Sequence, residues 1–158
     1  MATNAKIITT FEALEKLQKY CIYSDRCQYE VRNKLKLWQI DEISAESIIA
    51  TLVETNFLNE ERFATNFSHG KLVINHWGKV KIKSVLKRMQ LSPRCIQIAL
   101  NKLDDQEYSL ILKKEAEKKF NQTKGLIAQR KQKTIQFLIG KGFEIELIKE
   151  IIFDIIKQ

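Results

Sequence analysis

Three lysines spaced four residues apart are the side chains whose type and spacing point most directly to a chemical role. Lys79, Lys83 and Lys87 would stack along one face of a helix, where their mutual repulsion slightly destabilises an isolated helix. An anionic partner, either a phosphate backbone or an acidic protein surface, explains why they stand together. A solvated polar face is the alternative. The predicted binding residues are this strip and its neighbours: Lys71, Lys79, Lys81, Lys83, Lys87, Arg88 and Arg94.

Positive charge is concentrated in the middle of the chain. The net charge is +8, and residues 57–103 hold nine Lys and Arg against two Asp and Glu. Residues 1–56 have a net charge of −1 and residues 104–158 a net charge of +2. A uniformly basic protein would not have this distribution, so we expect the middle third to face an anion.

The sequence contains none of the patterns expected of a catalytic or metal site. His69 and His76 are two helical turns apart, about 10 Å along the axis, which is too far to hold one metal ion. The acidic residues gather at helix starts, where capping accounts for them. We therefore expect no enzyme activity, no cofactor and no metal. The three cysteines form no CxxC pair and are expected to be buried, reduced thiols.

No segment of the sequence is suited to membrane insertion or export. No apolar run approaches the roughly 18 residues that a spanning helix needs. The first residues, MATNAKIITTF, lack the apolar core and cleavage site of a signal peptide. We expect a cytoplasmic monomer whose residues 1–8 form a short disordered lead-in.

The composition favours an all-α chain, with one proline, five glycines and no two-residue alternation of apolar side chains. The residues predicted to begin helices are Thr9, Asp25, Ser44, Asn59, Ser92 and Asp104. After Asn59, the residues Phe63, Phe67, Ile74 and Trp77 are predicted to share one face. Gly70 lies on that face and would let a neighbouring helix approach closely.

The pattern of helices repeats about every 50 residues. The segments Leu35–Ile40, Leu86–Leu91 and Leu138–Phe143 align at offsets of 51 and 52 residues, each at the end of a second helix. A three-helix unit of this size buries little apolar surface alone, whereas stacked units bury the sides that they share. We predict three tandem three-helix repeats, residues 1–56, 57–103 and 104–158, in an elongated, curved helical array.

Three stretches of the sequence carry a family resemblance. They are Asp25-Arg-Cys-Gln-Tyr-Glu-Val-Arg-Asn-Lys-Leu35, Phe57-Leu-Asn-Glu-Glu-Arg-Phe-Ala64, and Gly78-Lys-Val-Lys-Ile82 leading through Leu86 to Leu91. With them the chain resembles the RecX family of bacterial regulators of the RecA recombinase, most strongly between about residues 20 and 103. Asn59-Glu60-Glu61 stands where the family often has a pair of aspartates, but it keeps a helix cap and an acidic first turn.

The resemblance implies three tandem three-helix repeats and a function without catalysis. A member of this family would bind RecA or RecA–DNA filaments and mainly restrain strand exchange, ATP hydrolysis and co-protease activity. Its setting would be recombination, DNA repair and the SOS response. Its own affinity for DNA would be weak, salt-sensitive and indifferent to sequence.

A stand-alone DNA-binding regulator is the alternative function. Ile82–Leu86, followed by Ser92-Pro93 and a second helix, resembles a helix-turn-helix. Arg94, Gln97 and Asn101 on the second helix are residue types that can contact base edges. This alternative predicts that the protein binds a preferred duplex sequence in the absence of RecA.

Overall fold

The computed structural model describes residues 7–158, and within them the chain forms nine α-helices and no strand. The helices are α1 (Thr10–Tyr23), α2 (Gln28–Leu37), α3 (Glu42–Glu54), α4 (Glu60–Val73), α5 (Lys79–Arg88), α6 (Pro93–Asn101), α7 (Asp105–Gln122), α8 (Ile127–Gly140) and α9 (Ile145–Lys157).

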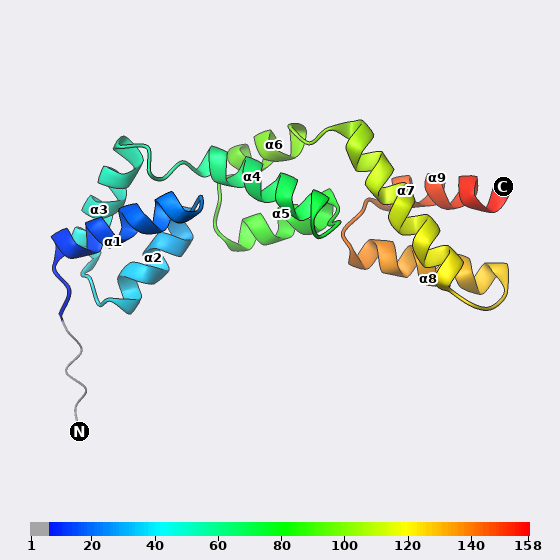
Figure 1. Ribbon diagram of the computed structural model, residues 1–158, viewed down its shortest axis with the longest axis horizontal. Coiled ribbons are helices and arrows are strands. Elements are labelled where there is room, and N and C mark those ends of the chain that lie inside the picture. Colours follow the sequence, from blue (N-terminus) through cyan, green and yellow to red (C-terminus); the bar gives the residue numbers. More distant parts are fainter. Residues whose placement is uncertain (1–6) are drawn as a thin grey trace, which may run out of the picture.

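The helices fall into three consecutive groups of three that follow one another along the long axis of the molecule (Figure 1). The first trio and α9 lie at opposite ends of this array (Figure 1). Among the described residues, close packing between helices stays within each trio, except where α4 meets α7. The prediction of an all-α, elongated array of three tandem three-helix repeats is therefore confirmed. We propose residues 56/57 and 103/104 as the limits of the repeats.

One turn recurs in all three repeats and fixes their alignment. Gln39, Gln90 and Gly142 have positive φ angles of 57°, 61° and 89°, and each follows the end of the second helix of its trio. The N–H of the next residue returns to a leucine carbonyl five positions earlier in each case, at 3.0, 3.2 and 3.1 Å. This is the Schellman arrangement, which ends a helix by satisfying its last carbonyls. The repeat inferred from the sequence is thus a repeat of backbone geometry.

The apolar core is divided into two clusters rather than three. The first is formed by the helices of the amino-terminal trio, with Leu17, Leu35 and Leu52 fully buried in it. The second runs through the middle and carboxy-terminal trios, from Phe63 to Ile152, and it also includes Cys27 of the first trio, with Tyr29 packed against it. The last two trios consequently form one body around a shared core, while the first trio has a core of its own.

A backbone contact joins the middle trio to the last one. The N–H of Gly78 donates to the Lys141 carbonyl at 2.8 Å, and the N–H of Val80 donates to the Gly142 carbonyl at 2.9 Å. A Cβ on Gly142 would lie 2.6 Å from the backbone nitrogen of Lys81, and a Cβ on Gly78 would overlap the carbonyl of Gly142. Only glycine can occupy positions 78 and 142 at this close backbone contact, and Gly142 also has a positive φ, which glycine adopts without steric cost.

Most predicted helix starts are confirmed. The side chains of Thr9, Asn59, Ser92 and Asp104 each accept a hydrogen bond from a backbone N–H in the first turn of the following helix. Each satisfies a donor that the helix itself leaves unpaired. Glu12 completes a capping box at the start of α1.

Two predicted helix starts are wrong. Cys27, not Asp25, precedes α2, and the backbone N–H of Cys27 is satisfied by Glu30 Oε2 at 3.0 Å. The cap of α3 is Asp41, whose carboxylate accepts from the N–H of Ser44 at 2.9 Å. A carboxylate three residues ahead of Ser44 takes the role that we had given to that serine.

The predicted apolar face of α4 is also shorter than expected. α4 ends at Val73, and Ile74, the residue that caps it, is 78% exposed. The position of a Cβ on Gly70 has no neighbour within 4 Å, so no close helix approach occurs there.

Six of the eight residues predicted to be a disordered lead-in, residues 1–6, lie outside the described part of the chain. Ile7 is exposed, and Ile8 packs against the core of the first trio. In residues 7–158 the structure contains no helix that is both long and apolar enough to span a bilayer.

Candidate partner-binding surface

Four of the seven predicted binding side chains reach solvent. Two buried residues, Ile82 and Leu86, hold α5 against the core. Because these two define the inner face of a 3.6-residue helix, Lys83 and Lys87 project away from the core, and both are exposed. Arg88 at the end of α5 and Arg94 at the start of α6 are exposed as well. These four cations form no ion pair with the described residues, so they are available to a partner.

The other three predicted side chains are half-buried against aromatic rings. Lys71 Nζ and Lys81 Nζ lie 4.8 and 4.5 Å from the ring centroid of Trp77. Lys79 Nζ lies 4.9 Å from the ring centroid of Tyr108 and 3.6 Å from Asp105 Oδ1. Cation–π contacts of this kind stabilise a site by about 0.5–1 kcal/mol where solvent still reaches it. These lysines therefore support the array and are less available than Lys83 and Lys87.

The helix pair considered as a helix-turn-helix is present as α5 and α6. α6 starts at Pro93, and the Ser92 side chain accepts from the N–H of Cys95 at 3.2 Å. Gln97 Nε2 donates to Asn101 Oδ1 at 2.8 Å. These two amides, which we had considered for base contacts, are thus hydrogen-bonded to each other on an exposed face.

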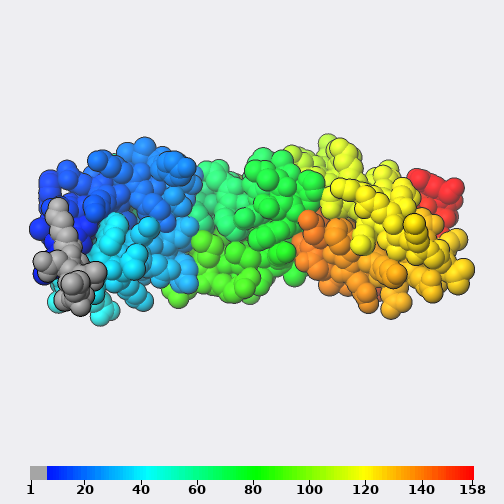
Figure 2. All heavy atoms as spheres, turned by 60° about the horizontal axis from the view of Figure 1, so that its bottom comes forward, coloured from blue at the N-terminus to red at the C-terminus, as the bar shows by residue number. Residues whose placement is uncertain are grey.

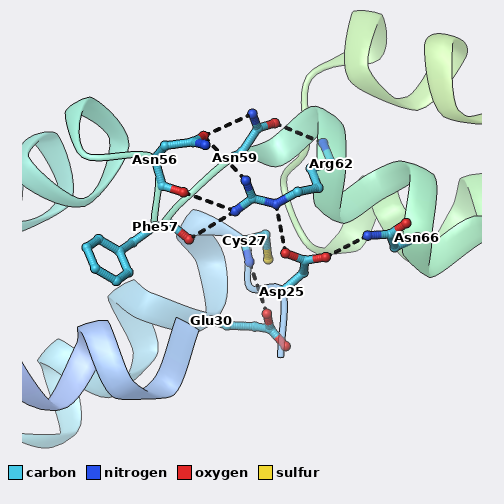
Figure 3. Close-up of polar contacts among 8 residues, drawn as sticks. All are labelled: Asp25, Cys27, Glu30, Asn56, Phe57, Asn59, Arg62 and Asn66. Carbon is cyan, nitrogen blue, oxygen red and sulfur yellow. Dashed lines mark hydrogen bonds and ion pairs between the residues drawn. The ribbon is translucent and has the colours of Figure 1, made fainter. Parts of the chain in front are cut away.

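A polar cluster that the sequence analysis missed joins the first trio to the middle one (Figure 3). Arg62 on α4 donates from Nε to Asp25 Oδ1 at 2.9 Å, and the other carboxylate oxygen of Asp25 accepts from Asn66 Nδ2 at 2.6 Å. The guanidinium also donates to the carbonyls of Asn56 and Phe57 at 3.2 and 3.4 Å. One arginine therefore ties the α1–α2 turn, the α3–α4 connector and α4 together.

The charge on Asp25 is favoured by these contacts. Burial alone would raise the pKa of Asp25, but hydrogen bonds from Asn66 and Arg62 outweigh it and hold the pKa below its ordinary value. A second contact crosses the same junction, because the N–H of Gln28 at the start of α2 donates to Glu60 Oε1 at 3.1 Å. These contacts join residues that are 32, 37 and 41 positions apart, so no local pattern in the sequence predicts the junction.

The junction between the middle and last trios also has polar contacts. The Tyr108 hydroxyl accepts from the N–H of Lys79 at 2.9 Å and donates to Glu144 Oε2 at 2.5 Å. Burial and the bond to Glu144 strongly raise the pKa of Tyr108, which keeps the hydroxyl protonated as a donor. His76 lies 2.8 Å from Glu115 and His69 lies 3.4 Å from Glu107. Both histidines therefore contact α7 of the same chain while their side chains remain partly exposed.

The described residues contain no group of three or more His, Cys, Asp or Glu side chains arranged to hold a metal ion. The cysteines are free thiols, with Cys21 and Cys27 buried. Burial raises the pKa of Cys21, and it raises the pKa of Cys27 to about 11.

Comparison with known proteins gives consistent results. Residues 106–152 match the family described as RecX, third three-helix domain. The chain is 31% identical to a regulatory protein RecX from Lactococcus lactis subsp. lactis, over 78% of this chain and 47% of the relative. It is 27% identical to one from Clostridium botulinum, over 93% of this chain and 72% of the relative. The chain spans about half the length of the Lactococcus protein.

The fold matches crystal structures of the same family. One, of RecX from Lactobacillus salivarius, superposes with a TM-score of 0.83 at 23% identity, covering 92% of this chain and 95% of that one. A second, of a regulatory protein RecX, gives the same TM-score at 22% identity, over 90% of this chain and 72% of that one. At these identities the superpositions establish a shared fold. Sequence matches along most of the chain and this shared architecture together show that the chain belongs to the RecX family of regulatory proteins.

Proposed function

We propose that this protein binds the RecA recombinase or the RecA–DNA filament and mainly restrains its strand exchange, ATP hydrolysis and co-protease activity. Membership of the RecX family supports the proposal. The observation that carries it here is the exposed pair Lys83 and Lys87, which projects from an elongated array and lacks a carboxylate partner among residues 7–158. We propose that the protein acts by contact, as a monomer without catalysis or cofactor, in the cytoplasm during recombination, DNA repair and the SOS response.

Some of the seven predicted cations contact other residues of the chain and some do not, and this difference decides which residues a test should change. Reversing Lys79 would place a carboxylate beside Asp105 and over the ring of Tyr108, and so would disturb the junction with the last trio. Lys83 and Lys87 carry no such contact. The informative variant is therefore Lys83→Glu/Lys87→Glu.

The experiment measures RecA ATPase activity, strand exchange and co-sedimentation with RecA filaments. The matched control is Lys149→Glu/Lys157→Glu, which reverses two exposed lysines of α9 and changes the net charge equally. We expect the α5 variant to bind filaments about tenfold more weakly or worse, because a like charge facing an anionic partner costs several kcal/mol. The control should bind like the parent.

Two results would contradict the proposal. One is a parent protein that leaves RecA ATPase and strand exchange unchanged. The other is tight binding of one preferred duplex sequence in the absence of RecA, which would favour the stand-alone DNA-binding regulator. Equal filament binding by the α5 variant and the parent would remove Lys83 and Lys87 from the site.

A further inference from the structure

The first trio has a hollow between its second and third helices, which we call the α2–α3 hollow. It has a volume of about 350 Å³ and is lined by Arg32, Leu35, Lys36, Ile40, Glu42, Ala45 and Glu46. Leu35 is fully buried, and Ile40 and Ala45 are half-buried against the core of the first trio. These three side chains form an apolar floor, and the four charged side chains form a rim around it.

The repeat alignment explains why the hollow forms. The third helices of the trios begin 51 and 52 residues apart, so the offsets found for the turns hold for these helices as well. The same offsets place Ile96 and Ile148 at the position of Ala45. Both isoleucines are buried, whereas Ala45 is half-buried. The first trio therefore lacks the side chain that fills this place in the other two trios.

The surroundings of the hollow are more apolar than the equivalent part of the middle trio. Leu37 and Ile43, which adjoin lining residues in the sequence, are 73% and 86% exposed. The offset of 51 residues places Arg88 and Arg94 at their positions. The same fold forms with arginine at these positions, so folding does not require the apolar side chains. Exposed apolar side chains gathered beside a hollow are typical of a surface that contacts a protein.

The charges on the rim favour a protein over a nucleic acid as the partner. Arg32 is neutralised by its ion pair with Glu46, which joins α2 to α3. Glu42 adds a second carboxylate, and carboxylates repel phosphate. Lys36 is exposed and forms no ion pair with residues 7–158. The rim therefore offers a single lysine to a carboxylate of the partner, beside an apolar floor.

The α2–α3 hollow also lies in the same row of helices as the lysines of α5. α2, α5 and α8 lie along the lower side of the molecule in Figure 1, and this side comes forward in Figure 2. Lys36 on α2 and Lys87 on α5 occupy equivalent positions of the repeat. A partner that contacts α5 and follows the long axis of the array would therefore reach the hollow.

We infer that the α2–α3 hollow receives an apolar side chain of RecA, and that a carboxylate of RecA next to this side chain pairs with Lys36. The inference rests on the proposed function for the identity of the partner. An apolar side chain seated in a pocket is the kind of contact that carries much of the binding free energy at a protein interface. The hollow would supply that contact, and the lysines of α5 would supply the electrostatic attraction.

Ala45→Ile tests the inference, because it introduces the residue that the other two repeats carry and so fills the hollow. Ala50→Ile is the matched control, since Ala50 is exposed on the same helix and lies outside the lining of the hollow. Co-sedimentation with RecA filaments and RecA ATPase activity are measured for the parent and both variants. Thermal unfolding by circular dichroism checks the fold, and Ala45→Ile should unfold at the parental temperature or above it, as cavity-filling substitutions do.

We expect Ala45→Ile to bind RecA filaments about tenfold more weakly than the parent, because the side chain of the partner no longer enters its pocket. Ala50→Ile should bind like the parent. Lys36→Gln changes only the exposed lysine and should weaken binding about two- to fivefold, the range expected for a solvent-exposed ion pair. This variant decides the question if Ala45→Ile lowers the unfolding temperature, since parental binding by Lys36→Gln would then overturn the inference.

Parental filament binding by a folded Ala45→Ile variant would overturn the inference and leave the proposed restraint of RecA intact. Equal losses in Ala45→Ile and Ala50→Ile would also overturn it, because the effect would not depend on the hollow. A parent that does not bind RecA filaments would contradict both the inference and the proposed function. If Ala45→Ile instead loses affinity for a labelled oligo(dT) without RecA, the hollow binds a nucleic acid and the inference is wrong.

Discussion

Replacing Asp25 by Asn tests whether the polar cluster between the first two trios holds them together. The substitution keeps the shape of the side chain but removes its charge and one of its two acceptor oxygens, which receive hydrogen bonds from Arg62 and Asn66 at 2.9 and 2.6 Å. The Asp25 side chain is 28% exposed and that of Arg62 is 36% exposed. A charge-assisted hydrogen bond contributes about 1.5–3 kcal/mol, and solvent screening lowers this value. We expect a loss of about 1–2 kcal/mol.

The assay uses the two tryptophans of the chain as separate reporters. Trp38 packs against the core of the first trio and Trp77 against the core shared by the other two. In a Trp77→Phe background, urea unfolding followed by fluorescence reports on the first trio, and a Trp38→Phe background reports on the remainder. Since Asp25 belongs to the first trio, Asp25→Asn should lower the unfolding midpoint seen by Trp38 more than the midpoint seen by Trp77.

The effect should also depend on pH in a defined direction. The folded protein holds the pKa of Asp25 below its ordinary value of 3.8. The stabilisation is therefore complete above about pH 4 to 5 and is lost as the pH falls through the folded-state pKa. The difference in stability between the parent and Asp25→Asn should be constant from neutral pH to about pH 5 and should shrink below about pH 4.

Glu46→Gln is the matched control, because it removes the carboxylate of another arginine pair, Arg32–Glu46, which lies within the first trio. Glu46 is more than half exposed, so its loss should be clearly smaller. Equal losses in the two variants would refute the reasoning, as would a difference for Asp25→Asn that persists undiminished at pH 3.

Three further outcomes are expected. Gly142→Ala should destabilise the protein by about 2–4 kcal/mol in urea unfolding, because a Cβ would meet backbone at a residue with positive φ. Gly70→Ala, with open space around it, should instead stabilise the protein by about 0.5–1 kcal/mol. Equal effects of the two substitutions would contradict the account of the contact between the middle and last trios. Tyr108→Phe should cost about 1–3 kcal/mol, since a buried N–H and a carboxylate lose their partner; an unchanged midpoint would show that water replaces the hydroxyl. Iodoacetamide at pH 8 should modify Cys27 far more slowly than half-buried Cys95, because Cys27 is buried and its pKa is about 11. Mass spectrometry of the labelled peptides measures both rates, and faster modification of Cys27 would contradict the prediction.

Local features of the sequence were sufficient to predict the repeated architecture. The caps at Thr9, Asn59, Ser92 and Asp104 and the turns at Gln39, Gln90 and Gly142 depend on residues a few positions apart. Such interactions leave a periodic signature that can be aligned. Gly142 lies in the aligned segment Leu138–Phe143, and glycine is the residue type that most readily adopts its φ of 89°.

Contacts over long sequence separations could not be predicted in the same way. Asp25 followed by Gln28 looks like a helix start, yet Asp25 pairs with Arg62, 37 residues later, because the first trio packs its α1–α2 turn against α4. Likewise Lys79 belongs by spacing to the row of Lys83 and Lys87, but α7 brings Tyr108 and Asp105 next to it. Spacing along one helix fixes which side chains share a face, and only packing between repeats decides which of them stay free.

The division of the apolar core affects how long any complex formed by both parts of the array would last. Helices α4–α9 share one core, and α1–α3 pack around a second core; the two parts are joined by Cys27 and Tyr29, which pack into the core of α4–α9, by polar contacts and by a short connector. Once one body has bound, the other searches only the small volume that the connector permits, and its local concentration reaches the order of millimolar. Full release then requires both bodies to detach before either rebinds. A long residence time would follow from two individually weak attachments.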